Sequence, residues 1–139
     1  MPFPKVPPGT ASLMRQVAWG DIFWFDFGHP ASRQFTYAFP HPCIVVSDPV
    51  TQVGKTLVVV PLTGAENAQP GYDYHVLITK AECPPLDKDS VAKADQLYTI
   101  ERDDLIDQYY IGRLGAKVMR RLYQQLANSL NFAVAARCQ

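Results

Sequence analysis

The stretch CIVVSDPVTQVGKTLVVVPL, residues 43–62, decides the fold class. It contains two short β-branched runs, 43–47 and 56–62, separated by a segment that holds proline and glycine. β-branched residues favour strands, whereas proline and glycine favour turns. We therefore predict that the two runs are neighbouring antiparallel strands.

Strand patterns continue on both sides of this stretch. Residues 20–27, GDIFWFDF, alternate in strand fashion, with Ile22, Trp24 and Asp26 on one face and Phe23, Phe25 and Phe27 on the other. Two further strands are predicted at 72–78 and at 90–100, the second with a bend or bulge around Asp95.

The end of the sequence predicts one amphipathic helix packed on the sheet. Its apolar residues recur at helical spacing: Val118, Met119, Leu122, Tyr123, Leu126, Ala127 and Leu130. Five to six short strands followed by one C-terminal helix predict a mainly β fold, a small half-open barrel.

The length of 139 residues suits a single domain. Residues 1–18 are rich in proline and predict an irregular arm, with a possible short helix capped by Thr10 or Ser12. The barrel domain is expected over 19–139.

Composition narrows the class of protein. Thirteen basic and thirteen acidic residues cancel, so the chain is not an obvious nucleic-acid binder, although residues 113–139 hold bases and no acid. Cys43, Cys83 and Cys138 show no ligand spacing for a metal, so free thiols are expected. With no signal peptide and no apolar run of ~18 residues, we expect a soluble, cytoplasmic protein.

His41 lies between two prolines, immediately before the first β-branched run. Proline restricts both its own backbone and that of the preceding residue, so this histidine is presented on a stiff, extended entry to a strand. The pattern leaves open whether His41 is a catalytic group, a ligand or part of the packing. His75, inside a predicted strand, is expected to be structural.

Five segments in order resemble the MazF/PemK (Kid) family of toxins from toxin–antitoxin systems. They are GDIFWFDFG (20–28), HPCIVVS (41–47), LVVVPLTG (57–64), DSVAKADQLYTIERDDL (89–105) and IGRLGAKVMRRLYQQL (111–126). Together they cover about residues 19–132.

The resemblance implies an SH3-like barrel with a C-terminal helix that usually forms a homodimer. It implies a metal-independent, cofactor-free endoribonuclease that cuts single-stranded RNA at short sequences and so inhibits growth. A small antitoxin, whose disordered C-terminal segment covers the RNA groove, neutralises such toxins. The expected products carry a 2′,3′-cyclic phosphate and a 5′-hydroxyl.

The resemblance also implies site residues. His41 stands where the family usually has a catalytic arginine; it can act as acid or base near neutral pH but lacks arginine's permanent, forked contact with phosphate. Its alternatives are a contact with RNA or antitoxin, or a structural role. Thr63 matches a threonine that donates to the phosphate, and its alternative is to cap the following turn.

Asp95 and Gln96 match an Asp-Gln pair of the family. Asp95 is a candidate acid, or instead a buried carboxylate that accepts backbone hydrogen bonds at a bend. Lys93 stands where some members have a catalytic arginine, and strand alternation places it on the face of Asp95 if no bulge intervenes. Gln96 is expected to order the barrel.

The long loop before His41 supplies candidate RNA-binding residues: His29, Arg33, Gln34, Phe35 and Tyr37, with Phe39 adding a further aromatic ring. Arg33 is a candidate replacement for the missing cation, and aromatic faces stack on unpaired bases. Alternatively, these rings cover the open end of the barrel.

Two other functions remain as alternatives. The chain is then a non-catalytic or CcdB-like barrel that binds a protein target such as gyrase, or RNA without cutting it, or else a general interaction barrel. A neutral chain that binds RNA is expected to do so with modest affinity and a shallow salt dependence.

Overall fold

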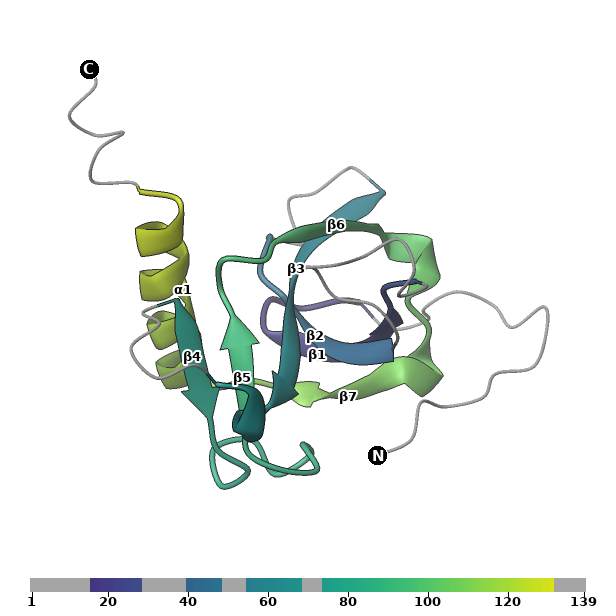
Figure 1. The fold of residues 1–139 in the computed structure, drawn as a ribbon. Coiled ribbons are helices and arrows are strands. Elements are labelled where there is room, and N and C mark those ends of the chain that lie inside the picture. The colour runs from purple at the N-terminus through teal and green to yellow at the C-terminus, as the bar shows by residue number, and fades with distance from the viewer. Residues whose placement is uncertain (1–15, 29–39, 49–54, 69–73, 132–139) are drawn as a thin grey trace, which may run out of the picture.

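A computed structural model describes residues 16–28, 40–48, 55–68 and 74–131. These residues form seven strands and one α-helix (Figure 1). The strands are β1 (Asp21–Asp26), β2 (Pro40–Val45), β3 (Thr56–Gly64), β4 (His75–Ile78), β5 (Ser90–Lys93), β6 (Tyr98–Glu101) and β7 (Tyr110–Arg113). The helix is α1 (Ala116–Ser129), and three short 3₁₀ turns, η2 (Ala65–Asn67), η3 (Arg102–Asp104) and η4 (Asp107–Tyr109), complete the set.

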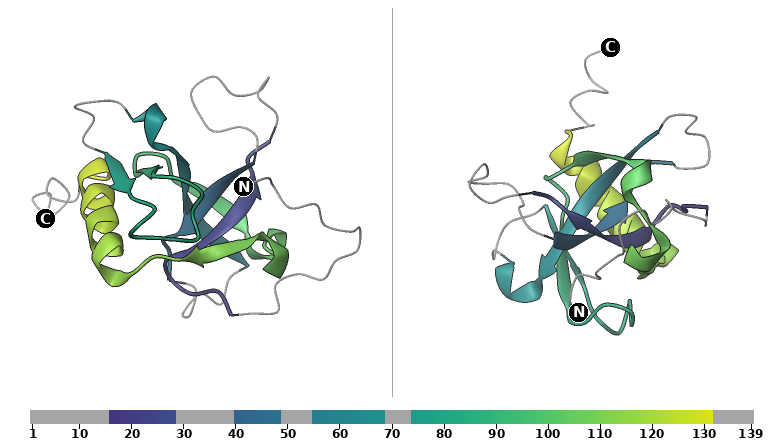
Figure 2. Two further views of the ribbon diagram at one scale, coloured as in Figure 1. Left: turned by 90° about the horizontal axis from the view of Figure 1, so that it is seen from below. Right: turned by 90° about the vertical axis from the view of Figure 1, so that its right-hand side faces the viewer.

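The strands form one curled antiparallel sheet in the order β4-β5-β3-β2-β1-β7, with β6 also paired to β3. The runs at 43–47 and 56–62 are indeed antiparallel neighbours, with Cys43 opposite Pro61 and Val45 opposite Val59. The long strand β3 pairs with β6 along its first part and with β5 along its last part. Figure 2 shows how the strands cross one another as the sheet curls.

Both faces of the central strands are buried. Ile22, Ile44 and Leu62 pack under α1 with Met119 and Leu122. The opposite face packs into a second cluster, which includes Phe23, Cys43, Val45, Leu57, Val59 and Leu105. Burial on two sides explains why 43–46 and 57–60 are continuous apolar runs instead of alternating ones.

Helix α1 lies beside β4 at one end of the sheet (Figures 1 and 2). Its buried residues are Val118, Met119, Leu122 and Leu126, members of the predicted apolar face. Tyr123 adds polar contacts, because its hydroxyl donates to the Val46 carbonyl and accepts from Trp19 Nε1 at 2.6 Å.

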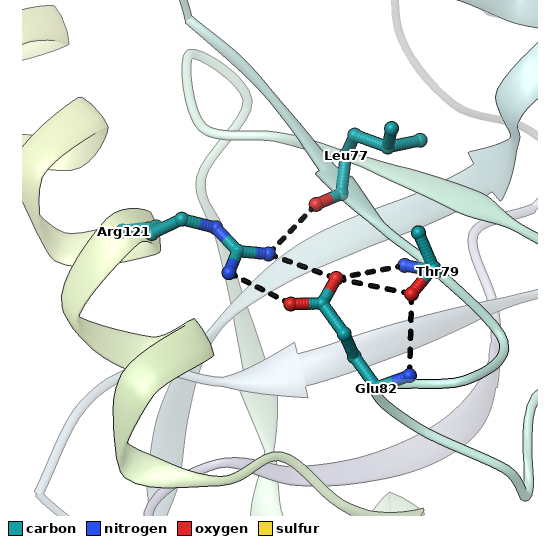
Figure 3. A network of polar contacts seen from close by, with 4 residues as sticks. All are labelled: Leu77, Thr79, Glu82 and Arg121. Carbon is teal, nitrogen blue, oxygen red and sulfur yellow. Dashed lines mark hydrogen bonds and ion pairs between the residues drawn. The ribbon is translucent and has the colours of Figure 1, made fainter.

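An ion pair also joins α1 to the sheet. Arg121 donates to both carboxylate oxygens of Glu82, at 2.8 and 3.0 Å, and to the Leu77 carbonyl at 3.0 Å (Figure 3). The Thr79 amide and hydroxyl donate to the same carboxylate. These hydrogen bonds, Arg121 first, lower the pKa of Glu82 to about 2.

The predicted fold class, mainly β with a C-terminal helix, is confirmed, but the strand count is higher than the five to six expected. The predicted strand at 90–100 is two strands, β5 and β6, because the Gln96 amide bonds the Lys93 carbonyl at 2.9 Å and turns the chain. Residues Tyr110–Arg113 form the additional strand β7. The sequence pattern does not predict it, and its pairing with β1 shows that it is a strand.

Some sequence expectations lie outside the described residues. They include most of the arm at 1–18 with its short helix, part of the strand expected at 72–78, and Cys138. Cys43 and Cys83 are free and buried, and burial raises the pKa of both thiols. No helix in the described part of the chain is long and apolar enough to cross a membrane.

Candidate active site

The end of the β2–β3 ladder positions His41 and Thr63. The paired part of β2 and β3 ends with Cys43 opposite Pro61, and His41 and Thr63 each lie two residues beyond this pair on their own strands. Pro42 and Pro61 have no amide hydrogen to donate, so fewer backbone hydrogen bonds can form between β2 and β3 at this point. On its other side β2 stays paired with β1, with His41 opposite Phe25.

A pocket of about 320 Å³ opens at this point, and both His41 and Thr63 line it. We call it the His41 pocket. Its wall includes the apolar residues Trp24, Leu62, Pro85, Leu86 and Ile111. Its polar lining includes Glu66, Asn67, Asp87, Lys88 and Ser90.

His41 is half-buried, and its ring lies 6.5 Å from the ring of Phe27, centroid to centroid. Thr63 is also half-buried, and its hydroxyl oxygen accepts a hydrogen bond from Asn67 Nδ2 at 2.9 Å. The same hydroxyl still has its O–H group, which can donate a hydrogen bond to a ligand in the pocket. The lining of the pocket thus includes both an imidazole ring and a hydroxyl donor.

The far wall comes from the loop between β4 and β5, which lies below these strands in Figure 1. It presents Asp87 and Lys88 to the pocket. Lys88 Nζ pairs with Glu66 Oε1 at 2.8 Å, and this bond lowers the pKa of the Glu66 carboxyl. Sequence reasoning missed Glu66, Asn67 and Lys88, because their segments show no motif; only the polar run DKDS after two prolines signals a functional loop.

Lys93 and Asp95 do not line the His41 pocket. Strand β5 ends at Lys93 and a turn follows, so simple alternation does not place Asp95 on the face of Lys93. Asp95 is exposed, so the alternative of a buried carboxylate is wrong.

Lys93 and Asp95 instead lie near His75, which is opposite Lys93 in the β4–β5 pair. Burial lowers the pKa of His75, the charge of Lys93 lowers it further, and the charge of Asp95 opposes both. By alternation along β5, Lys93 shares the sheet face of Val91, which pairs with Thr63. Thr63 and Lys93 therefore lie on one face of the sheet, but Lys93 does not line the His41 pocket.

Gln96 accepts a hydrogen bond from the Tyr98 hydroxyl at 3.3 Å, at the turn between β5 and β6. The loop candidates His29, Arg33, Gln34, Phe35 and Tyr37, together with Phe39, lie outside the described residues. Within the described ranges, no group of three or more His, Cys, Asp or Glu side chains is placed to hold a metal ion.

Comparison with known proteins identifies the family. The family model described as "PemK-like, MazF-like toxin of type II toxin-antitoxin system" matches residues 18–130. No curated protein matches the chain.

Solved structures share the fold. An endoribonuclease in complex with its cognate antitoxin, from a mycobacterial species, is 22% identical with a TM-score of 0.64, over 83% of this chain and 95% of that one. Another mycobacterial endoribonuclease is 21% identical with a TM-score of 0.62, over 85% and 94%. MazF from Deinococcus radiodurans is 17% identical with a TM-score of 0.63, over 84% and 98%.

Proposed function

Since the chain belongs to the family of PemK-like, MazF-like toxins of type II toxin–antitoxin systems, we propose that it is a metal-independent endoribonuclease that cuts single-stranded RNA at short sequences. One observation carries the proposal: His41 and Thr63, from two neighbouring strands, line the same pocket. Solved structures of the same fold include endoribonucleases, one in complex with its cognate antitoxin. A cognate antitoxin and a homodimer are part of the proposal.

The chemistry uses the 2′-hydroxyl of the RNA as the nucleophile. A base removes the proton of that hydroxyl, its oxygen bonds to phosphorus, and the bond to the 5′-oxygen breaks as that oxygen takes up a proton. The products are a 2′,3′-cyclic phosphate and a 5′-hydroxyl. His41 acts on one of the two protons, either as the base that removes the first or as the acid that supplies the second. Acid–base groups of this kind contribute roughly 10²–10⁴-fold to the rate.

The Thr63 hydroxyl donates a hydrogen bond to a phosphate oxygen as negative charge builds up on that oxygen. Lys93 and Asp95 form a second group outside the His41 pocket, in which Lys93 donates to a phosphate and Asp95 is a candidate acid. The loop residues His29, Arg33, Gln34, Phe35 and Tyr37 are proposed to bind the flanking RNA.

The first experiment incubates the purified protein with a long unstructured RNA in EDTA and identifies the product ends. We expect specific cuts with 2′,3′-cyclic phosphate ends, and a loss of cutting on the order of 10²-fold or more in His41→Ala. If His41→Ala cuts as the wild type does, the role of His41 is wrong, whatever the family.

Thr63→Val tests the hydroxyl donor, and Thr99→Val is its matched control, since Thr99 is an exposed threonine of β6 outside the pocket. Only Thr63→Val is expected to slow cutting. If the folded, antitoxin-free wild-type protein does not cut RNA, the ribonuclease proposal is rejected. The result would then favour a barrel that binds RNA or a protein target without cutting.

A further inference from the structure

The proposed reaction needs a positive charge that does not leave its site. Negative charge develops on the phosphate as the 2′-oxygen bonds to phosphorus, and preorganised cations stabilise such charge. His41 cannot supply it throughout, because a ring that accepts or donates a proton changes its own charge. Thr63 is neutral and Lys93 does not line the His41 pocket, so a cation within the pocket must come from another residue.

Among the described residues that line the His41 pocket, Lys88 is the single lysine or arginine. Glu66 and Asp87 line the same pocket, so without Lys88 an RNA phosphate there would face two carboxylates and no permanent cation. The geometry points to Lys88 as a further catalytic residue, whose ammonium binds the scissile phosphate, with Glu66 as the positioning residue that holds it. This inference rests on the proposed ribonuclease function.

The backbone that carries Lys88 is firmly held. Leu86, two residues earlier, is buried in the core under α1, and Pro85 packs so closely on β7 that a Cβ at Gly112 would lie 2.9 Å from Pro85 Cγ. Lys80 Nζ donates to the Leu86 carbonyl at 2.7 Å, and Ser90 Oγ donates to the Lys88 carbonyl at 3.0 Å. These contacts hold the backbone of the β4–β5 loop in place, while the Lys88 side chain stays exposed.

Glu66 reaches Lys88 by lying over a glycine. An added Cβ at Gly64 would come within 2.3 Å of both Glu66 carboxylate oxygens, so the observed position of Glu66 requires that Gly64 lack a side chain. The side chains of Lys88 and Glu66 are each 61% exposed, and exposed pairs add little to stability. The pair is therefore expected to add little to the stability of the fold. An ammonium has three donors, so Lys88 can keep Glu66 and still bind a phosphate.

The test compares Lys88→Gln, Lys88→Arg and the control Lys117→Gln, which removes one positive charge from the exposed surface of α1. Cleavage is measured under single-turnover conditions in EDTA, and binding is measured with a fully 2′-O-methylated copy of the RNA, which cannot be cut. For Lys88→Gln we expect cleavage to slow on the order of 10²-fold. The slope of log affinity against log salt should become shallower by about 0.7.

Lys88→Arg should keep most of the activity, and Lys117→Gln should resemble the wild type. If Lys88→Gln cuts as fast as Lys117→Gln while the wild type is active, the inference is overturned and the ribonuclease proposal stands. If the wild type neither binds nor cuts RNA, both are overturned. Thermal unfolding of Lys88→Gln should match the wild type, which separates loss of function from loss of folding.

Glu66 is tested through its partner. At saturating RNA, Glu66→Gln should slow cleavage in the wild type and have no further effect in Lys88→Gln, because non-additivity marks residues that act together. Gly64→Ala should act in the same direction without changing any charge, since the backbone at Gly64 (φ −63°, ψ 149°) accepts alanine and the new Cβ displaces the Glu66 carboxylate. Equal slowing by Glu66→Gln in both backgrounds would refute the positioning role.

Discussion

Asp21 is a fully buried acid at the start of β1. One of its carboxylate oxygens accepts from Arg113 Nε at 2.7 Å, and the other accepts from the Ala18 amide at 2.8 Å. Arg113 belongs to β7, so this carboxylate joins β1 and β7, the first and last strands along the described chain. Asp21 therefore has a structural role, and the site residues proposed above lie elsewhere.

Removal of this charge should destabilise the protein. Asp21→Asn keeps the size of the side chain but loses the ion pair, and we expect the free energy of unfolding to fall by about 1–3 kcal/mol. Urea unfolding measures this change. Asp26→Asn is the control at the exposed end of the same strand, and its change should stay within about 0.5 kcal/mol. Equal losses in the two variants would contradict the role given to Asp21.

At the scale of elements, α1 is attached to the sheet both by its apolar face and by the contacts of Arg121 with Glu82 and the Leu77 carbonyl (Figure 3). Leu77 is in β4, the end strand of the described sheet. Arg121 occupies one carbonyl of that strand, a group that would otherwise be available to another chain.

The attachment should depend on pH. The pKa of Glu82 is lowered from its usual 4.5 to about 2, so the pair with Arg121 stabilises the folded protein fully above pH about 4.5. This contribution is lost as pH falls toward 2. Thermal unfolding of the wild type and of Glu82→Gln should therefore differ most above pH about 4.5 and converge below it. Glu101→Gln, in an exposed position on β6, is the control. A difference that grows on acidification would contradict the pairing.

At the scale of the whole molecule, the curled sheet separates two apolar clusters and opens a pocket where the β2–β3 ladder ends. The chain carries no net charge, and the two exposed basic residues of α1, Lys117 and Arg120, lie outside the pocket. RNA binding should thus depend on a few charged contacts together with stacking.

Salt dependence tests this distribution of charge. Few phosphate contacts mean that the slope of log affinity against log salt for the 2′-O-methylated RNA should be no steeper than roughly −3, about four contacts on a single strand. Affinity measured between low and moderate salt supplies the slope. A much steeper slope would show that RNA also follows a basic surface outside the His41 pocket.

The sequence by itself determined the strands around 43–62, the strand at 20–27, the amphipathic helix and His41 as a candidate, and the family resemblance added Thr63. Alternation, helical spacing and proline are local signals, so they can be read without the fold. The tertiary structure alone decided that His41 and Thr63 share a pocket with Lys88 and Glu66, that Asp95 is exposed, and that Tyr110–Arg113 is a strand. These depend on contacts between residues far apart in the chain, such as Asp21 with Arg113, and no local pattern of side chains records such pairings.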